Sequence, residues 1–193
     1  MIAQIKGRLI EKTPTYVVID CNGVGYELKI SLNTYSNLGD SEVCLLFTHF
    51  VVREDAQLLY GFKETSEREL FRLLISVSGV GSATAMMILS SLSPNDTKQA
   101  ILNNDVVTLK SVKGIGAKSA ERIIIDLRDK IGKVDSSSII SNPLSNTVKH
   151  EALSALVMLG FGKNPAEKAL NKVMTSEEEL TVEELIKRTL KKL

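Results

Sequence analysis

Apolar and polar residues alternate along the first third of the chain, and apolar residues recur at helical spacing along the rest. The alternation predicts strands at Ile2–Ile10, Tyr16–Cys21, Val24–Ile30, Val43–Val52 and Gln57–Tyr60. Asn22-Gly23 between the second and third strands predicts a type I′ hairpin turn, which needs positive φ at both central residues. Short strands with a brief helical turn near residues 33–37 indicate a small OB-like β-barrel over residues 1–62.

The helical part contains one phrase that occurs twice at a constant offset, first over residues 77–88 and again over residues 112–123. In this alignment the paired glycines are Gly79 with Gly114 and Gly81 with Gly116. An offset held over this length indicates one supersecondary unit used twice. Apolar residues at helical spacing lie on both sides of each glycine pair, so the unit is predicted to be helix, tight glycine turn, helix.

Such a turn suits an anion. Glycines permit positive φ and close approach of a ligand, and the following helix begins with unpaired amides at the positive end of its dipole. The phosphate-binding candidates are the four glycines together with Ser82, Lys118, Ser119 and Arg122. A dinucleotide fold is the rival interpretation of G-x-G before a helix, but it requires a preceding strand and a third glycine or alanine, and both are missing here. Ordinary packing corners without a ligand are the other alternative.

Charge supports the phosphate interpretation. The chain of 193 residues has a net charge of +1, but residues 1–62 sum to about −2, residues 63–134 to about +3 and residues 135–193 to about zero. Positive charge therefore gathers around the second glycine turn. Lys118 lies in the first turn of a helix, where a cation is unfavourable unless an anion binds beside it. The first copy offers only hydroxyls there and is expected to hold phosphate more weakly.

Further signals divide the rest of the chain. Ser66-x-x-Glu69 predicts a capping box before the first glycine turn, and Ser93-Pro94 predicts another helix start. The tandem helical domain is placed at 63–133, and the polar stretch 134–147 is predicted to be a linker. Residues 148–193 predict a three-helix domain, whose second and third helices start near Asn164-Pro165 and Thr181.

Two further features each allow a structural and a functional interpretation. Arg53-Glu54-Asp55 between strands four and five is either a solvated loop tip or a device that steers nucleic-acid strands apart by repulsion. Phe161 on a glycine corner is either buried or part of a protein-docking patch with Leu156 and Leu159. Most of the aromatic residues lie in the barrel, where core packing is favoured over a surface that stacks on single strands.

Several classes are disfavoured. No stretch has the pattern of a membrane span or of a secretion leader. None matches a nucleotide-binding loop either, so any ATP hydrolysis must come from a partner. Cys21 and Cys44 have no disulfide or metal spacing, which suits a reducing cytosol, and no metal or cofactor is expected.

Three stretches together resemble the RuvA family, the Holliday-junction-binding subunits of the bacterial branch-migration machine. They are Val51–Phe62, the two glycine turns at their spacing, and the Leu156–Phe161 corner. The resemblance implies an α+β multidomain fold: an OB-like barrel, a double helix-hairpin-helix domain and a mobile three-helix, UBA-like domain. It implies a non-catalytic DNA-binding subunit of a helicase complex in recombination, DNA repair and the SOS response, acting in the cytoplasm as a homotetramer or an octamer.

The same resemblance assigns roles to residues. Glu54 and Asp55 match an acidic pin at the junction centre, and Gly79, Gly81, Gly114, Gly116 and Lys118 match phosphate-gripping positions. The Leu156–Phe161 corner matches the surface that docks the hexameric AAA+ ATPase RuvB, and the resolvase RuvC is a further partner. The chain departs from many relatives in having Ala83 and Ala117 where they have lysine. A nuclease or glycosylase that grips DNA with a double hairpin, and a single-strand binder that uses the barrel, remain the alternatives.

Overall fold

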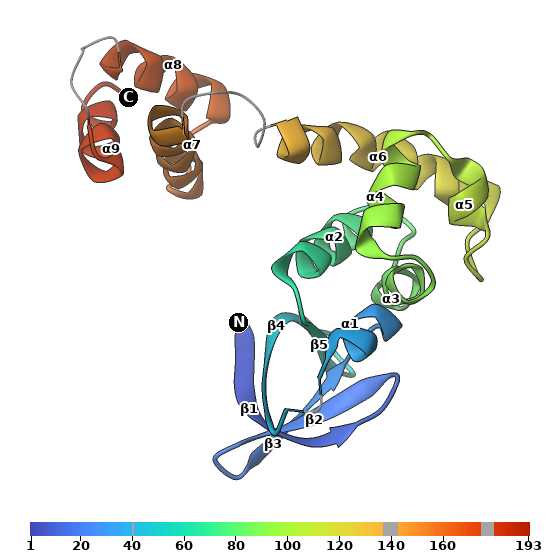
Figure 1. Ribbon diagram of the computed structural model, residues 1–193. Helices are drawn as coiled ribbons and strands as arrows, with labels where there is room; N and C mark the ends of the chain where they lie inside the picture. Colours follow the sequence, from blue (N-terminus) through green and yellow to red (C-terminus); the bar gives the residue numbers. More distant parts are fainter. Residues whose placement is uncertain (40, 137–142, 175–179) are drawn as a thin grey trace. The chain divides into compact units, whose positions relative to one another are not determined.

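A computed structural model describes residues 1–39, 41–136, 143–174 and 180–193 of the chain. It forms two compact units, Met1–Ser137 and Ser138–Leu193 (Figure 1). The first unit contains β1 (Gln4–Lys12), β2 (Tyr16–Cys21), β3 (Val24–Lys29), α1 (Leu32–Asn37), β4 (Val43–Val52), β5 (Gln57–Phe62), α2 (Thr65–Ile75), α3 (Ser82–Ser91), α4 (Pro94–Leu102), α5 (Val106–Lys110) and α6 (Ala117–Ser136). The second contains α7 (Pro143–Met158), α8 (Lys163–Val173) and α9 (Val182–Leu190). The predicted α+β class is confirmed.

The strands close into a barrel in the order β1-β2-β3-β5-β4, which confirms the predicted OB-like barrel. Neighbouring strands are antiparallel except β3 and β5, which meet in parallel at Lys29 and Tyr60. The predicted turn is present, since Asn22 and Gly23 have φ of 54° and 91°. Alternate side chains of the strands, such as Val17 and Ile19 on β2, fill the interior.

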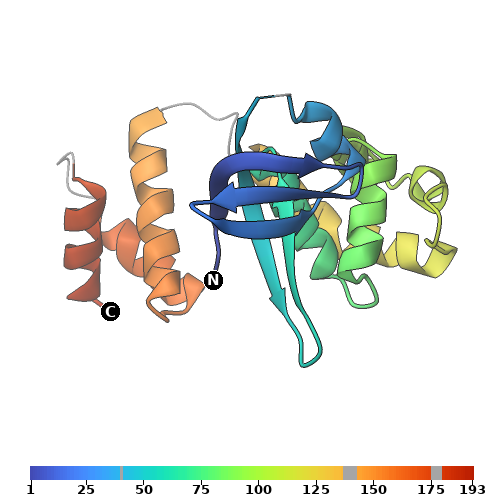
Figure 2. The same cartoon turned by 90° about the horizontal axis from the view of Figure 1, so that it is seen from below.

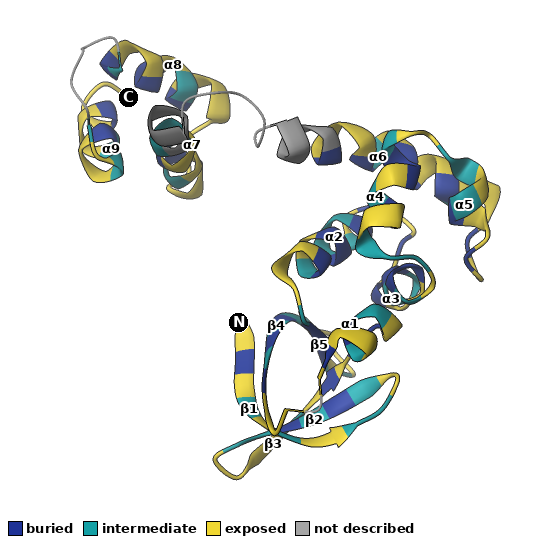
Figure 3. Ribbon diagram, in the orientation of Figure 1, coloured by how far each residue is buried: buried dark blue, intermediate teal, exposed yellow. Residues whose placement is uncertain are grey.

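The helices of the first unit share a core with the end of the barrel. Tyr60 and Phe62 at the end of β5 belong to the same buried cluster as the helical residues Leu74, Ile88 and Ile123. Phe71 of α2 stacks against both aromatic rings of β5, at centroid distances of 5.1 and 5.0 Å. Figure 3 shows the buried residues of these helices gathered on their inward sides. Barrel and helices therefore form one continuous packed unit.

Local signals predicted some helix starts and missed another. Ser93 caps α4 by accepting from the Asp96 amide, as predicted. The capping box at Ser66-x-x-Glu69 was wrong, because α2 begins at Thr65 with Glu64 as its N-cap and no side-chain cap bond. Only two residues separate β5 from α2, so Ser66 already lies inside the first helical turn and is not available as a cap.

Helices extend into both ends of the stretch 134–147 that was predicted to be a linker. Of the predicted linker 134–147, residues up to Ser136 continue α6 and residues from Pro143 begin α7, while 137–142 lie outside the described residues. In the second unit α7, α8 and α9 pack around a small core of Ala152, Leu156, Ala166, Leu170, Val173 and Leu185. The predicted capping box at Thr181 is present, whereas α8 starts at Lys163, just before the predicted Asn164-Pro165.

Candidate nucleic-acid interface

The two copies of the repeated phrase form the same backbone corner. Gly79 and Gly114 both have φ of +89°, a conformation that L side chains rarely adopt. The amide after each glycine bonds back to the carbonyl of the preceding valine, at 3.0 Å for Val80 to Val77 and 3.1 Å for Ile115 to Val112. α3 and α6 then begin at equivalent positions of the alignment. The repeat predicted from the sequence is therefore a structural repeat.

Each corner is anchored from beneath by two apolar side chains. Val77 and Val80 are 2% and 5% exposed, and their counterparts Val112 and Ile115 are 2% and 6% exposed. Their burial in the common helical core holds the corner rigidly, while the glycines between them stay exposed. The backbone amides of each corner are thus placed before any ligand arrives, so ordering them costs little on binding.

The helices that follow the corners begin without a capping side chain. The N-cap of α3 is Gly81, and α6 begins directly after Gly116. The connecting helices differ, since Ser93 caps α4 and Asp105 caps α5. Hydrogen bonds from the Thr108 hydroxyl and amide hold the pKa of Asp105 below its ordinary value. The first amides of α3 and α6, at the positive ends of the helix dipoles, therefore remain available to an external anion.

The second glycine of each pair leaves room for that anion. Gly81 has an extended φ of −84°, which any residue can adopt. A Cβ built on Gly81 or on Gly116 would meet nothing within 4 Å. Neither position needs glycine to avoid a clash inside the chain. What the missing Cβ provides at both corners is close access of a ligand to the backbone.

The predicted phosphate-binding side chains do not all reach the surface. Lys118 and Arg122 on α6 are exposed, and Arg122 has only a long contact of 4.0 Å with Asp126, an exposed pair that costs little to break. Ser119 is half-buried. Ser82 is only 7% exposed, so α3 presents its backbone amide more readily than its hydroxyl.

Lys113 is a candidate that the sequence interpretation did not single out. It directly precedes Gly114 and is exposed, and its counterpart in the first corner is Ser78. The alignment of the two copies could have indicated Lys113, because this cation stands directly before Gly114, one of the paired glycines of the turn. Together Lys113, Lys118 and Arg122 surround the second corner with positive charge; we call these three residues the cation group. The first corner has Ser78, Ala83 and Met87 at the same positions.

The acidic residues lie at the end of a projecting hairpin. β4 and β5 pair as far as Val52 and Gln57, and the Arg53 amide donates to the Ala56 carbonyl at 2.8 Å to close the turn. Glu54 and Asp55 at its tip are exposed. Figure 2 shows this hairpin extending beyond the other strands of the barrel. The stem next to this tip is held in place, because the paired residues Val51 and Leu58 pack against the helical core that also carries the glycine corners.

The barrel aromatics do not form an open stacking surface. Tyr60 and Phe62 are buried, and the other five, Tyr16, Tyr26, Tyr35, Phe47 and Phe50, are half-buried. Lys12 lies over the Tyr35 ring and Arg68 over the Phe47 ring. Core packing, the interpretation favoured from the sequence, accounts for most of these rings.

The corner of the second unit presents apolar side chains. Gly160 has φ of +98°, and the amides of Gly160 and Phe161 bond back to the carbonyls of Val157 and Leu156, which is the Schellman geometry that ends a helix. Leu156 is fully buried in the core, so its predicted place in a docking surface was wrong, because that position faces α8 and α9. We define the corner patch as Val157, Met158, Leu159 and Phe161, which are 43%, 87%, 62% and 37% exposed.

The residues that the structure describes include no group of three or more His, Cys, Asp or Glu side chains placed to hold a metal ion. No helix among them is both long enough and apolar enough to cross a membrane.

Comparisons with known proteins cover the whole chain. The RuvA N terminal domain matches residues 1–61, the SAM-like helix-hairpin-helix tandem matches 71–129, and the RuvA C-terminal domain matches 147–193. Similar curated proteins, each called Holliday junction branch migration complex subunit RuvA, come from Christiangramia forsetii (55% identical), Flavobacterium psychrophilum (51%) and Bacteroides fragilis (46%). Each alignment covers 100% of this chain and 100% of the relative. All three domain models match in order, and more than half of the residues are identical to those of a full-length relative. The chain therefore belongs to the RuvA family.

Proposed function

We propose that this chain is the non-catalytic DNA-binding subunit of a branch migration complex, and that it binds four-way DNA junctions in the cytoplasm without reading their sequence. The carrying observation is the pair of superimposable glycine corners, each open at the start of an uncapped helix. The full-length similarity to curated branch migration subunits supports the same conclusion.

The grip is a backbone grip strengthened by charge. Amides at the starts of α3 and α6 donate to phosphate oxygens, and the cation group adds positive charge at the second corner. Contacts to phosphate carry no base information, so the affinity follows the shape of the DNA. Because neutralised phosphates release counterions, the affinity falls with salt, with a log–log slope of about −0.9 for each phosphate neutralised on duplex arms.

The acidic hairpin acts where the arms meet. In a homotetramer, four copies of Glu54 and Asp55 face the strands that cross the centre of an open, nearly planar junction. Like charges at short range repel, so single strands are pushed apart and into the outgoing arms. The exposed tip and the packed stem of the hairpin suit this role, because the carboxylates are presented on a rigid support.

The motor is a separate chain. We assign the corner patch to docking of the hexameric ATPase RuvB, since its four apolar side chains are exposed on a unit distinct from the one that carries the glycine corners. The junction resolvase RuvC is a further partner of the assembled complex.

A gel-shift series tests the DNA-binding proposal. The full chain is titrated against a four-way junction, a linear duplex and a single strand of equal length, each in two unrelated base sequences. We expect the junction to bind at least about tenfold more tightly than duplex, with little difference between sequences. Equal affinity for junction and duplex overturns the proposal, and preference for the single strand favours the barrel-based alternative. Cleavage of any substrate with Mg²⁺ present favours the nuclease alternative.

Substitutions in the corner patch test the docking assignment. Met158→Ser with Leu159→Ser removes the most exposed apolar side chains without touching buried Leu156, so the fold of the second unit is expected to persist. Junction affinity should stay unchanged while junction-stimulated ATP hydrolysis by added RuvB falls about tenfold or more. Lys168→Ser on α8, exposed and outside the patch, is the matched control. Normal ATPase stimulation by the double variant rejects the assignment.

A further inference from the structure

The seam between the barrel and the helices contains a buried carboxylate that the proposed DNA grip does not use. Glu67 on α2 is 0% exposed. Its two carboxylate oxygens accept hydrogen bonds from the hydroxyls of Ser31 and Thr34, the latter at 2.8 Å. Ser31 is the N-cap of α1 and Thr34 lies within it, and both are fully buried. Glu67, which belongs to the helical part of the first unit, is therefore hydrogen-bonded to the barrel part.

These bonds belong to a closed network. The Ser31 hydroxyl also accepts from the Thr34 amide at 2.9 Å, and the Thr34 hydroxyl accepts from the Lys63 amide at 3.2 Å. Each hydroxyl thus donates to Glu67 and accepts from a backbone amide, which fixes the direction of both hydroxyl protons. Buried polar networks of this kind tolerate little displacement, because a broken bond leaves a desolvated group unpaired.

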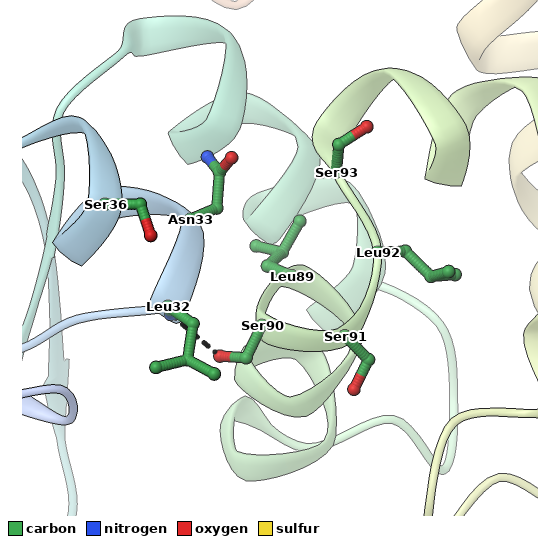
Figure 4. A pocket seen from close by; sticks show the side chains of 8 residues that line it. All are labelled: Leu32, Asn33, Ser36, Leu89, Ser90, Ser91, Leu92 and Ser93. Atoms are coloured by element: carbon green, nitrogen blue, oxygen red, sulfur yellow. Dashed lines mark hydrogen bonds between the residues drawn. The ribbon is translucent and has the colours of Figure 1, made fainter.

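The rest of the seam combines polar and apolar contacts. The Arg68 side chain of α2 donates to the Ala3 carbonyl of the barrel at 3.1 Å and lies over the Phe47 ring. Where α1 meets the end of α3, the Leu32 amide donates to the Ser90 hydroxyl at 3.1 Å, beside a shallow hollow lined by Asn33, Ser36 and the residues from Leu89 to Ser93 (Figure 4). Phe71 packs on Tyr60 and Phe62 through apolar ring contacts, which restrict the relative position of the two parts less sharply than buried hydrogen bonds do. Apolar packing holds the two parts together, and the Glu67 network adds directional bonds whose side chains are fully buried.

The orientation across this seam decides where the acidic hairpin lies relative to the glycine corners. The hairpin belongs to the barrel strands β4 and β5, whereas the corners belong to α2–α3 and α5–α6. We infer that Glu67 is a positioning residue that sets the angle between the acidic hairpin and the phosphate-gripping corners, and thereby the preference for branched over linear DNA. This inference rests on the proposed function, since it concerns how both sites act on one junction.

The experiment separates the orientation of the acidic hairpin from the affinity of the glycine corners for DNA. Glu67→Met keeps the length of the side chain and removes the directional bonds, whereas Glu67→Gln keeps one acceptor oxygen and leaves one hydroxyl proton without its partner. Glu64→Met, exposed at the start of α2, is matched in charge change. Each full-length variant is titrated against duplex and four-way junction, and strand opening at the centre is followed by 2-aminopurine fluorescence. Thr34→Val supplies a second break in the network should Glu67→Met not fold.

We expect Glu67→Met and Thr34→Val to retain duplex affinity, to lose about tenfold of the junction preference and to lose most of the fluorescence signal. Glu64→Met should behave as the wild type, and Glu67→Gln should lose only part of the junction preference, because it keeps one of the two bonds. In a Glu54→Gln, Asp55→Asn background, Glu67→Met should change strand opening no further, because the two act through one element. An unchanged junction preference in Glu67→Met, an equal loss on both substrates, or additive effects with the hairpin variants overturns the inference. A wild type without junction preference instead defeats the proposed function itself.

Discussion

The two glycine corners are alike in backbone and unlike in charge. Both have a glycine at φ of +89°, the same bond from the amide after that glycine and the same buried apolar anchors. Around the second corner stand the exposed Lys113, Lys118 and Arg122, whereas the first has a serine, an alanine and a methionine at those positions. The two copies therefore share the geometry that presents amides and differ in their cations.

The difference separates two contributions to phosphate binding. Amides at a fixed corner give direction, since they must point at the oxygen, and cations give long-range attraction that salt screens. The first corner therefore offers the directional part alone, and the second offers both. Ala83 leaves the first corner without a cation at the position where the second has Lys118.

The largest effect is expected from removing the cation group. Changing Lys113, Lys118 and Arg122 together to alanine should lower junction affinity by about a hundredfold or more at low salt, and should reduce the salt slope by about one for each phosphate that is no longer neutralised. The matched control in the first corner is Ser78→Ala with Met87→Ala, for which neither quantity should change more than about twofold. Fluorescence-anisotropy titrations over a range of salt measure both. Equal effects of the two variants would contradict the assignment of the charge contribution to the cation group.

Glycine substitution should weaken the first corner without altering the salt slope. Gly81→Ala places a Cβ where nothing in the chain lies within 4 Å, so it obstructs only an incoming ligand, and we expect about a tenfold loss of junction affinity. Its stability should stay within about 1 kcal/mol of the wild type, since lower unfolded-state entropy offsets the poorer cap. Gly79→Ala, by contrast, forces an L side chain to φ of +89° and should cost about 1–2 kcal/mol of unfolding free energy. Titrations and urea denaturation together check the pair; unaltered binding by Gly81→Ala would remove the backbone grip from the first corner.

Helix α4, which lies between the two corners in the sequence and is capped within the chain, provides a variant that should change stability but not DNA binding. Ser93→Ala removes the hydroxyl that accepts from the Asp96 amide at the start of α4, and it should lower the free energy of unfolding by about 1 kcal/mol. Junction affinity should not change, because that helix end is satisfied within the chain. A marked loss of affinity would mean that α4 also contacts DNA, and the distinction between capped and open helix starts would no longer hold.

A smaller effect is expected on the stability of the protein at acidic pH. The hydrogen bonds from Thr108 lower the pKa of Asp105 below its ordinary value of 3.8, so on acidification the unfolded chain binds this proton first. The stabilising contribution of Asp105 is present above pH 3.8 and is lost as the pH falls towards the lowered pKa of the folded state. Asp105→Asn keeps a capping oxygen but does not titrate, so its unfolding midpoint in urea should fall less steeply than that of the wild type below about pH 4. Parallel curves for the two proteins would contradict this account.

The sequence by itself determined the features that depend on neighbouring residues. Strand alternation, the Asn22-Gly23 turn, the cap at Ser93 and the register of the two glycine pairs were all predictable, because positive φ, period-two burial and cap bonds are local requirements. The position of Lys113 beside Gly114 was also visible in the alignment of the two copies, but its exposure was known only from the structure.

Tertiary structure alone decided the rest. Leu156 and Phe161 are alike as apolar residues near one helix end, yet packing against α8 and α9 buries the first and leaves the second accessible. The Ser66-x-x-Glu69 pattern failed as a cap because the short connection from β5 starts α2 earlier. Glu67 could be recognised as part of an amphipathic helix, but not as a bond to Ser31 and Thr34, because residues far apart in the chain meet only when the barrel and the helices pack together.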